Sequence, residues 1–62
     1  MKITLNGSVV ETAASTVAAL LGDVPTGRAV AVNREVVPRS AHHTHSVRDG
    51  DEIEIVEAVA GG

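Results

Sequence analysis

Cysteine and aromatic residues are both absent from this chain of 62 residues. Without cysteine there can be no disulfide, no thiolate metal site and no cysteine nucleophile. Without Phe, Tyr or Trp there are no rings to stack on bases or sugars, and the core must be built from Val, Ile, Leu and Ala. These absences exclude thiol-based catalysis and binding by aromatic stacking.

Positive charge is also scarce, because five Lys and Arg face eight Asp and Glu and the net charge is −3 with His neutral. Nucleic-acid binding requires clusters of Lys and Arg, so we predict no nucleic-acid partner. No apolar run approaches the ~18 residues of a membrane span, and the first residues show no targeting pattern. We therefore predict no membrane association and a cytoplasmic location.

The acidic residues gather near the end of the chain. This group comprises Asp49, Asp51, Glu52, Glu54 and Glu57. They fit a solvated strand face, or a patch that steers the C-terminus towards a basic partner, and the two interpretations are compatible.

The small size permits one domain with one thin core and leaves little room for a deep catalytic pocket. Ser, His and Asp are all present, but there is no Gly-x-Ser-x-Gly elbow and no phosphate-binding loop. We therefore predict that the chain is not an enzyme and that it binds no cofactor itself.

The first half predicts a hairpin followed by a helix. Residues 2–6 alternate with Ile3 and Leu5 on one face, and Asn6-Gly7 favours a tight turn into a second strand at 8–12. Ser15 or Thr16 can then cap a short helix that ends at Gly22. Its apolar stripe comprises Val17, Leu20 and Leu21.

Three further strands are predicted at residues 29–32, 35–37 and 52–55, with a loop or short 3₁₀ turn at 39–45. Only a mixed sheet with a helix packed on one face buries all of these apolar faces together. We therefore expect an α+β domain of about four to five strands and one main helix over residues 1–57. Residues 58–62 should form a flexible tail that reaches at most roughly 17 Å.

Three histidines, His42, His43 and His45, suggest a metal site because their imidazoles are close in sequence. The segment has no acidic or thiol ligand to complete such a site. We interpret it as a solvated loop and predict no metal.

Gly61-Gly62 at the end of the sequence is the most informative feature. A carboxylate at the end of a chain is ionised at neutral pH and is a poor electrophile. Adenylation would convert it into a good acyl donor, and for this the tail must enter the active site of a partner. Glycine suits such a passage because it has no side chain and few conformational restrictions.

Several stretches in order resemble the ThiS family of thiamine-biosynthesis sulfur carriers. They are Val30-Ala31-Val32-Asn33, Val36-Val37-Pro38-Arg39, Asp49-Gly50-Asp51-Glu52-Ile53 and Val59-Ala60-Gly61-Gly62, together with the opening hairpin and the helix. The resemblance covers essentially the whole chain and implies the β-grasp, or ubiquitin-like, fold. The histidine run is not part of the family pattern, and we assign it no role.

The resemblance also implies a mechanism in which Gly62 is the adenylation and thiocarboxylate site. A ThiF-type adenylyltransferase would use Mg-ATP to activate Gly62, and a cysteine desulfurase or similar donor would supply sulfur. Thiazole synthase (ThiG) would accept that sulfur. Gly61 would give clearance, and Val59 and Ala60 would lie with it in the channel of the partner.

Three alternatives stay open at this point. One is the small, MoaD-like subunit of molybdopterin synthase, although such chains tend to be longer and to carry a proline-containing run before Gly-Gly. Another is a ubiquitin-like modifier that is joined to lysines through Gly62. The third is a binding module with an inert tail.

Overall fold

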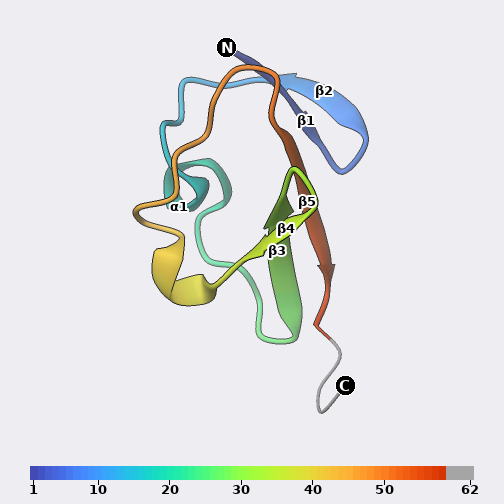
Figure 1. Ribbon diagram of the computed structural model, residues 1–62, viewed down its shortest axis with the longest axis vertical. Coiled ribbons are helices and arrows are strands. Elements are labelled where there is room, and N and C mark those ends of the chain that lie inside the picture. The colour runs from blue at the N-terminus through green and yellow to red at the C-terminus, as the bar shows by residue number, and fades with distance from the viewer. Residues whose placement is uncertain (59–62) are drawn as a thin grey trace.

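The computed structural model describes residues 1–58, which form five strands, one α-helix and one 3₁₀ turn (Figure 1). In chain order these are β1 (Lys2–Leu5), β2 (Ser8–Glu11), α1 (Val17–Leu21), β3 (Arg28–Val32), β4 (Glu35–Val37), η1 (Arg39–Ala41) and β5 (Glu52–Glu57). Every predicted element is present. The order of elements is the predicted one.

The five strands form one mixed sheet in the order β2-β1-β5-β3-β4. β5 lies at the centre, parallel to β1 and antiparallel to β3, and β4 is an edge strand that ends before Pro38. α1 packs against one face of this sheet (Figure 1). The predicted α+β architecture is therefore confirmed.

The core between α1 and the sheet is entirely aliphatic, as the lack of aromatic residues requires. Its buried members are Ile3, Val17, Val24, Val30, Val32, Val37, Val47 and Ile53. Ile53, in the central strand, is completely buried. Leu20 and Leu21 of α1 are half-buried and pack against this cluster.

Two tight turns with positive φ join the hairpin strands. Asn6 and Gly7 have φ values of 48° and 84°, and Asn33 and Arg34 have φ values of 50° and 70°. This left-handed backbone matches the twist of two-residue hairpins, and Asn and Gly adopt it most readily. The Asn6-Gly7 turn was predicted on this ground, and it is confirmed.

α1 has only five residues and depends on its surroundings. The hydroxyl of Thr16 accepts a hydrogen bond from the Ala19 N–H at 3.1 Å, which confirms the predicted cap. The two N–H groups before Ala19 donate to loop carbonyls: Val17 to His45 at 3.0 Å and Ala18 to His42 at 2.8 Å. The loop after η1 therefore completes the helix N-terminus. No helix within residues 1–58 is long and apolar enough to cross a membrane.

The histidine segment differs from the solvated loop that we expected. His42 is 7% exposed, and its Nε2 lies 3.2 Å from the Val37 carbonyl oxygen. His43 is exposed and His45 is half-buried. His42 is buried for two reasons: its backbone carbonyl accepts a hydrogen bond from α1, and its ring packs against the end of β4. The polar residues around it in sequence do not predict this contact.

Candidate functional site

The central strand β5 leads directly into the residues that we predict to be functional. Ala58 is the last residue that the structure describes. The predicted site residues, Val59, Ala60, Gly61 and Gly62, lie outside the described part of the chain. The described site is therefore the exit end of β5, which we define as Glu57, Ala58 and the facing turn at residues 25–28.

A backbone hydrogen bond holds Ala58 at this exit end. Its N–H donates to the Gly27 carbonyl at 2.8 Å, one step beyond the Arg28–Glu57 pair that ends the β3–β5 ladder. The first residue of the predicted tail is thus still attached to the sheet. Gly27 has a φ of 89°, which a residue with a side chain rarely adopts.

The turn that faces Ala58 is itself closed by a bond from the Arg28 N–H to the Pro25 carbonyl at 3.1 Å. The Arg39 guanidinium, from η1, donates from Nη1 to the Val24 carbonyl at 2.7 Å and from Nη2 to the Pro25 carbonyl at 3.2 Å. An exposed ion pair of 4.0 Å joins Arg28 to Glu57. No local sequence pattern predicts these contacts of Arg39, because its two partners lie 15 and 14 positions earlier in the chain.

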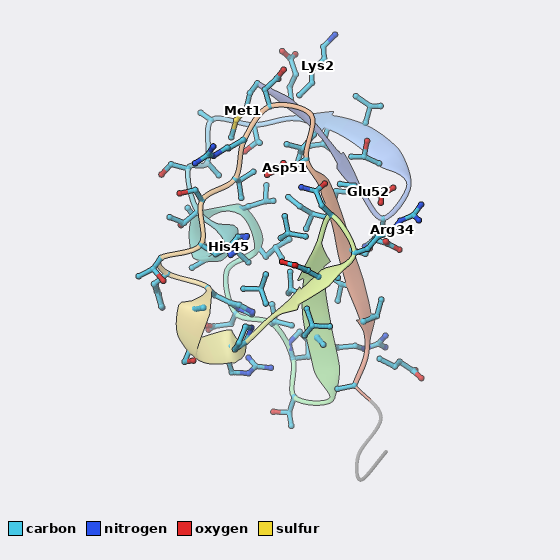
Figure 2. The ribbon with its side chains drawn as sticks, viewed as in Figure 1. Met1, Lys2, Arg34, His45, Asp51 and Glu52 are labelled. Carbon is cyan, nitrogen blue, oxygen red and sulfur yellow. The ribbon has the colours of Figure 1, made fainter. Side chains whose placement is uncertain are left out.

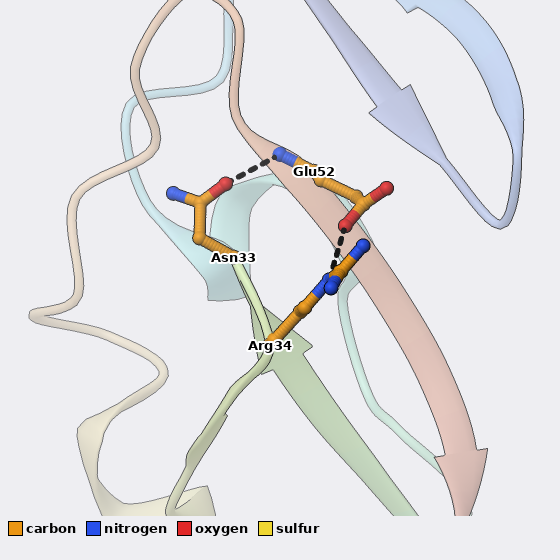
Figure 3. A network of polar contacts seen from close by, with 3 residues as sticks. All are labelled: Asn33, Arg34 and Glu52. Atoms are coloured by element: carbon orange, nitrogen blue, oxygen red, sulfur yellow. Dashed lines mark hydrogen bonds and ion pairs between the residues drawn. The ribbon is translucent and has the colours of Figure 1, made fainter.

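The opposite end of β5, its entry end, is held by side chains. Asn33 Nδ2 donates to Asp51 Oδ1, and Asn33 Oδ1 accepts from the Glu52 N–H, both at 3.0 Å. Arg34 adds an ion pair to Glu52 at 3.7 Å (Figure 3). Further along β5, Asn6 Oδ1 accepts from the Ile55 N–H at 2.9 Å.

The acidic group divides into two sets. Asp49 accepts from the Lys2 N–H at 2.8 Å, and Asp51 accepts from the Arg48 N–H at 2.9 Å as well as from Asn33 (Figure 2 labels Lys2 and Asp51). These two carboxylates organise the turn before β5. Glu57 instead stands exposed at the exit end, where its carboxylate pairs with Arg28.

The sheet face opposite α1 carries exposed valines. Val36 and Glu54 both pair with Ala31 across β3 and share its face, and Val56 pairs with Ala29 on the same face. Val36 is 67% exposed and Val56 is 39% exposed. On this face, exposed apolar side chains lie next to the acidic side chain of Glu54, close to the exit end.

The described residues form neither a metal site nor a nucleophile with a base. Within residues 1–58 no three His, Asp or Glu side chains lie close enough to hold a metal ion. In the same range no serine hydroxyl is hydrogen-bonded to a histidine ring. A surface hollow of about 610 Å³ is lined mainly by polar side chains, among them His45 and Arg48.

The sequence profile of the ThiS family matches residues 3–62, which is nearly the whole chain. The crystal structure of a thiamine biosynthesis protein (ThiS) from Geobacter metallireducens superposes with a TM-score of 0.77 and 29% identity, and all of both chains is covered. This likeness confirms the predicted β-grasp fold.

Two curated proteins are also similar. A thiazole synthase of Paramagnetospirillum magneticum is 46% identical over 66 aligned residues, which include all of this chain and 20% of that protein. The sulfur carrier protein ThiS of Escherichia coli is 44% identical over 36 residues, or 58% of this chain and 54% of that protein. The chain thus spans a fifth of the first relative and about half of the second.

Proposed function

This chain belongs to the ThiS family, and we propose that it carries sulfur for thiamine biosynthesis on the carboxyl group of Gly62. The observation that carries the proposal is the family match through Gly61-Gly62, which follow the central strand β5 closely in sequence. The similar protein from E. coli is named a sulfur carrier, which supports the same role here.

The first step is activation of the carboxylate. A carboxylate oxygen of Gly62 attacks the α-phosphorus of ATP, pyrophosphate leaves, and an acyl-adenylate remains. The sequence has no phosphate-binding loop, so a ThiF-type adenylyltransferase supplies the Mg-ATP site. The chain acts in this step as the substrate of an enzyme, and it binds no cofactor of its own.

The second step exchanges AMP for sulfur. A sulfur nucleophile attacks the acyl carbon of Gly62, the bond to AMP breaks, and a thiocarboxylate remains once the sulfur is at the oxidation level of sulfide. If the donor is a persulfide, such as that of a cysteine desulfurase, a thiol must reduce the acyl disulfide that forms first. This chain has no cysteine, so that thiol belongs to the donor or to the partner.

The acceptor of the sulfur is thiazole synthase (ThiG). A segment similar to this whole chain makes up a fifth of a protein that is named thiazole synthase. The joining of a segment similar to this chain with a thiazole synthase in one polypeptide supports the proposal that the two work in consecutive steps. We propose that both act in the cytoplasm.

Binding to these partners uses the exposed sheet face. Val36 and Val56 supply apolar area beside Glu54 on this face, so the matching surface of a partner is apolar with a basic residue opposite Glu54. Docking there would leave Val59, Ala60 and Gly61 to enter the channel of the partner, where small residues meet little steric resistance.

Intact-mass spectrometry tests the function. The full chain is incubated with ATP, a ThiF-type adenylyltransferase and a sulfur donor, and the expected product is heavier by the replacement of one oxygen with sulfur. Omission of ATP and a variant extended by one alanine after Gly62 are the controls, and both should stay unmodified. Isopeptide conjugates in place of the thiocarboxylate would instead identify a protein modifier, and an unmodified chain would contradict the proposal.

A further inference from the structure

The Arg39 side chain binds the start of the exit turn and the residue before it at two points. Its guanidinium donates 2.7 Å and 3.2 Å hydrogen bonds to the carbonyls of Val24 and Pro25. Hydrogen bonds from a charged donor are about twice as strong as neutral ones, and the planar fork fixes two acceptors relative to each other. The loop is therefore held in a defined position relative to η1.

A continuous series of contacts links Arg39 to the last described residue. The Pro25 carbonyl that accepts from Arg39 also accepts the Arg28 N–H, which closes the turn at 3.1 Å. Gly27, inside that turn, presents its carbonyl to the Ala58 N–H at 2.8 Å. Any shift of the turn thus moves the point from which the reactive C-terminal residues depart.

We propose that Arg39 is a positioning residue for the adenylation of Gly62: by bracing the turn at residues 25–28, it sets the direction in which the C-terminal residues leave the sheet. This inference rests on the proposed function. Arg39 does not touch the reacting atoms. It acts through the Pro25 carbonyl and the Gly27–Ala58 bond.

Loss of the Arg39 hydrogen bonds should affect the adenylation step and not the binding of the chain to the adenylyltransferase. Docking uses the sheet face, which is formed by other residues, so its affinity should not depend on Arg39. The attack of the Gly62 carboxylate on ATP requires near-attack geometry, and a misplacement of about 1 Å can lower a rate by about 100-fold. A looser exit turn should therefore lower kcat and leave KM for the carrier unchanged.

The test compares Arg39→Met, Arg39→Lys and Arg48→Met in ATP–pyrophosphate exchange with the adenylyltransferase, well below the melting temperature of each variant. Arg48→Met is the matched control, because it removes the same charge from the segment just before the entry end of β5. We expect Arg39→Met to lower kcat by about 10-fold or more with KM within about 2-fold. Arg39→Lys, which can satisfy one carbonyl, should recover part of that loss, and Arg48→Met should match the wild type.

Amide hydrogen exchange gives a second measurement that needs no partner. In Arg39→Met the Ala58 amide should exchange faster while the Ile53 amide keeps its protection. Unchanged exchange at Ala58, or an unchanged kcat, overturns the inference. The inference is also overturned if Arg39→Met loses protection at all amides alike and Arg48→Met loses kcat to the same extent. Arg39 would then contribute only to general stability. If the wild-type chain is not adenylated at all, the proposed function fails, whereas the exchange at Ala58 still decides whether Arg39 braces the exit end.

Discussion

The two ends of β5 are held in different ways. At the entry end, the Asn33 side chain accepts from the Glu52 N–H and donates to the Asp51 carboxylate, and Arg34 adds an ion pair to Glu52. At the exit end, one backbone hydrogen bond holds Ala58, and the only side-chain contact of Glu57 in the described chain is an exposed ion pair at 4.0 Å. One strand thus has a strongly fixed beginning and a lightly held end.

We infer from this difference that the entry end of β5 contributes mainly to stability and the exit end mainly to function. The buried residue Ile53 lies next to the entry end, where side-chain interactions add to the core. The exit end must deliver a carboxylate to another protein, and the side chain that braces its turn, Arg39, comes from η1 and not from β5. Substitutions at the entry end should therefore change stability, and substitutions at the exit end should change activity.

Removal of Gly61 and Gly62 should have the largest effect and should act on function alone. We expect no thiocarboxylate in the mass assay, because the reactive carbon and its clearance are both lost. The free energy of unfolding should change by less than about 0.5 kcal/mol, since the buried core of the described residues 1–58 ends at Ile53. A truncated chain that still supports thiazole formation would remove the distinction between the two ends.

Ile53→Ala should have the largest effect on stability. Ile53 is completely buried at the centre of the sheet, and such a truncation lowers the free energy of unfolding by about 2–5 kcal/mol. Urea denaturation followed by circular dichroism measures the change. Val56→Ala, on the exposed face of the same strand, is the control and should lose less than about 1 kcal/mol. Equal losses at both positions would contradict the assigned register of β5.

Asn33→Ala should have an intermediate effect, because it removes two hydrogen bonds and places alanine at a φ of 50°. We expect a loss of about 1–3 kcal/mol in the same denaturation experiment. Asn33→Gly also loses the hydrogen bonds but tolerates the positive φ, so it should be less destabilising. If both variants are as stable as the wild type, the entry end is not held by this network.

Glu57→Gln should have the smallest effect on stability. The Arg28–Glu57 pair is long and its carboxylate is 81% exposed, and surface pairs of this kind contribute about 0–1 kcal/mol. We expect a loss below about 0.5 kcal/mol that disappears in high salt. A loss as large as that of Asn33→Ala would show that the exit end is fixed as firmly as the entry end.

Features that depend on neighbouring residues in sequence could be predicted. The Asn6-Gly7 hairpin turn, the Thr16 cap and the alternation that buries Ile53 are each encoded within a few residues. Together with the apolar pattern they leave few arrangements other than a helix on a mixed sheet. The family resemblance then supplied the chemistry of the C-terminus, which no pattern in the fold encodes.

Features that depend on contacts between distant segments could not be predicted. His42 lies in a polar stretch, and its burial follows from the need of α1 for acceptors at its N-terminus. Arg39 binds carbonyls of a loop whose position is fixed only once η1 and β3 have packed. Even so, Val24, which contributes one of those carbonyls, is a buried aliphatic residue next to Pro25, and that pairing favours a loop anchored in the core.

The most direct test of this account is the intact mass of the wild-type chain after reaction with ATP, the adenylyltransferase and a sulfur donor. Tandem mass spectrometry of the product then locates the change. We expect one oxygen to be replaced by sulfur at the carboxyl group of Gly62 and nowhere else. Sulfur on any other residue, or an unmodified Gly62 in the presence of an active partner, would contradict it.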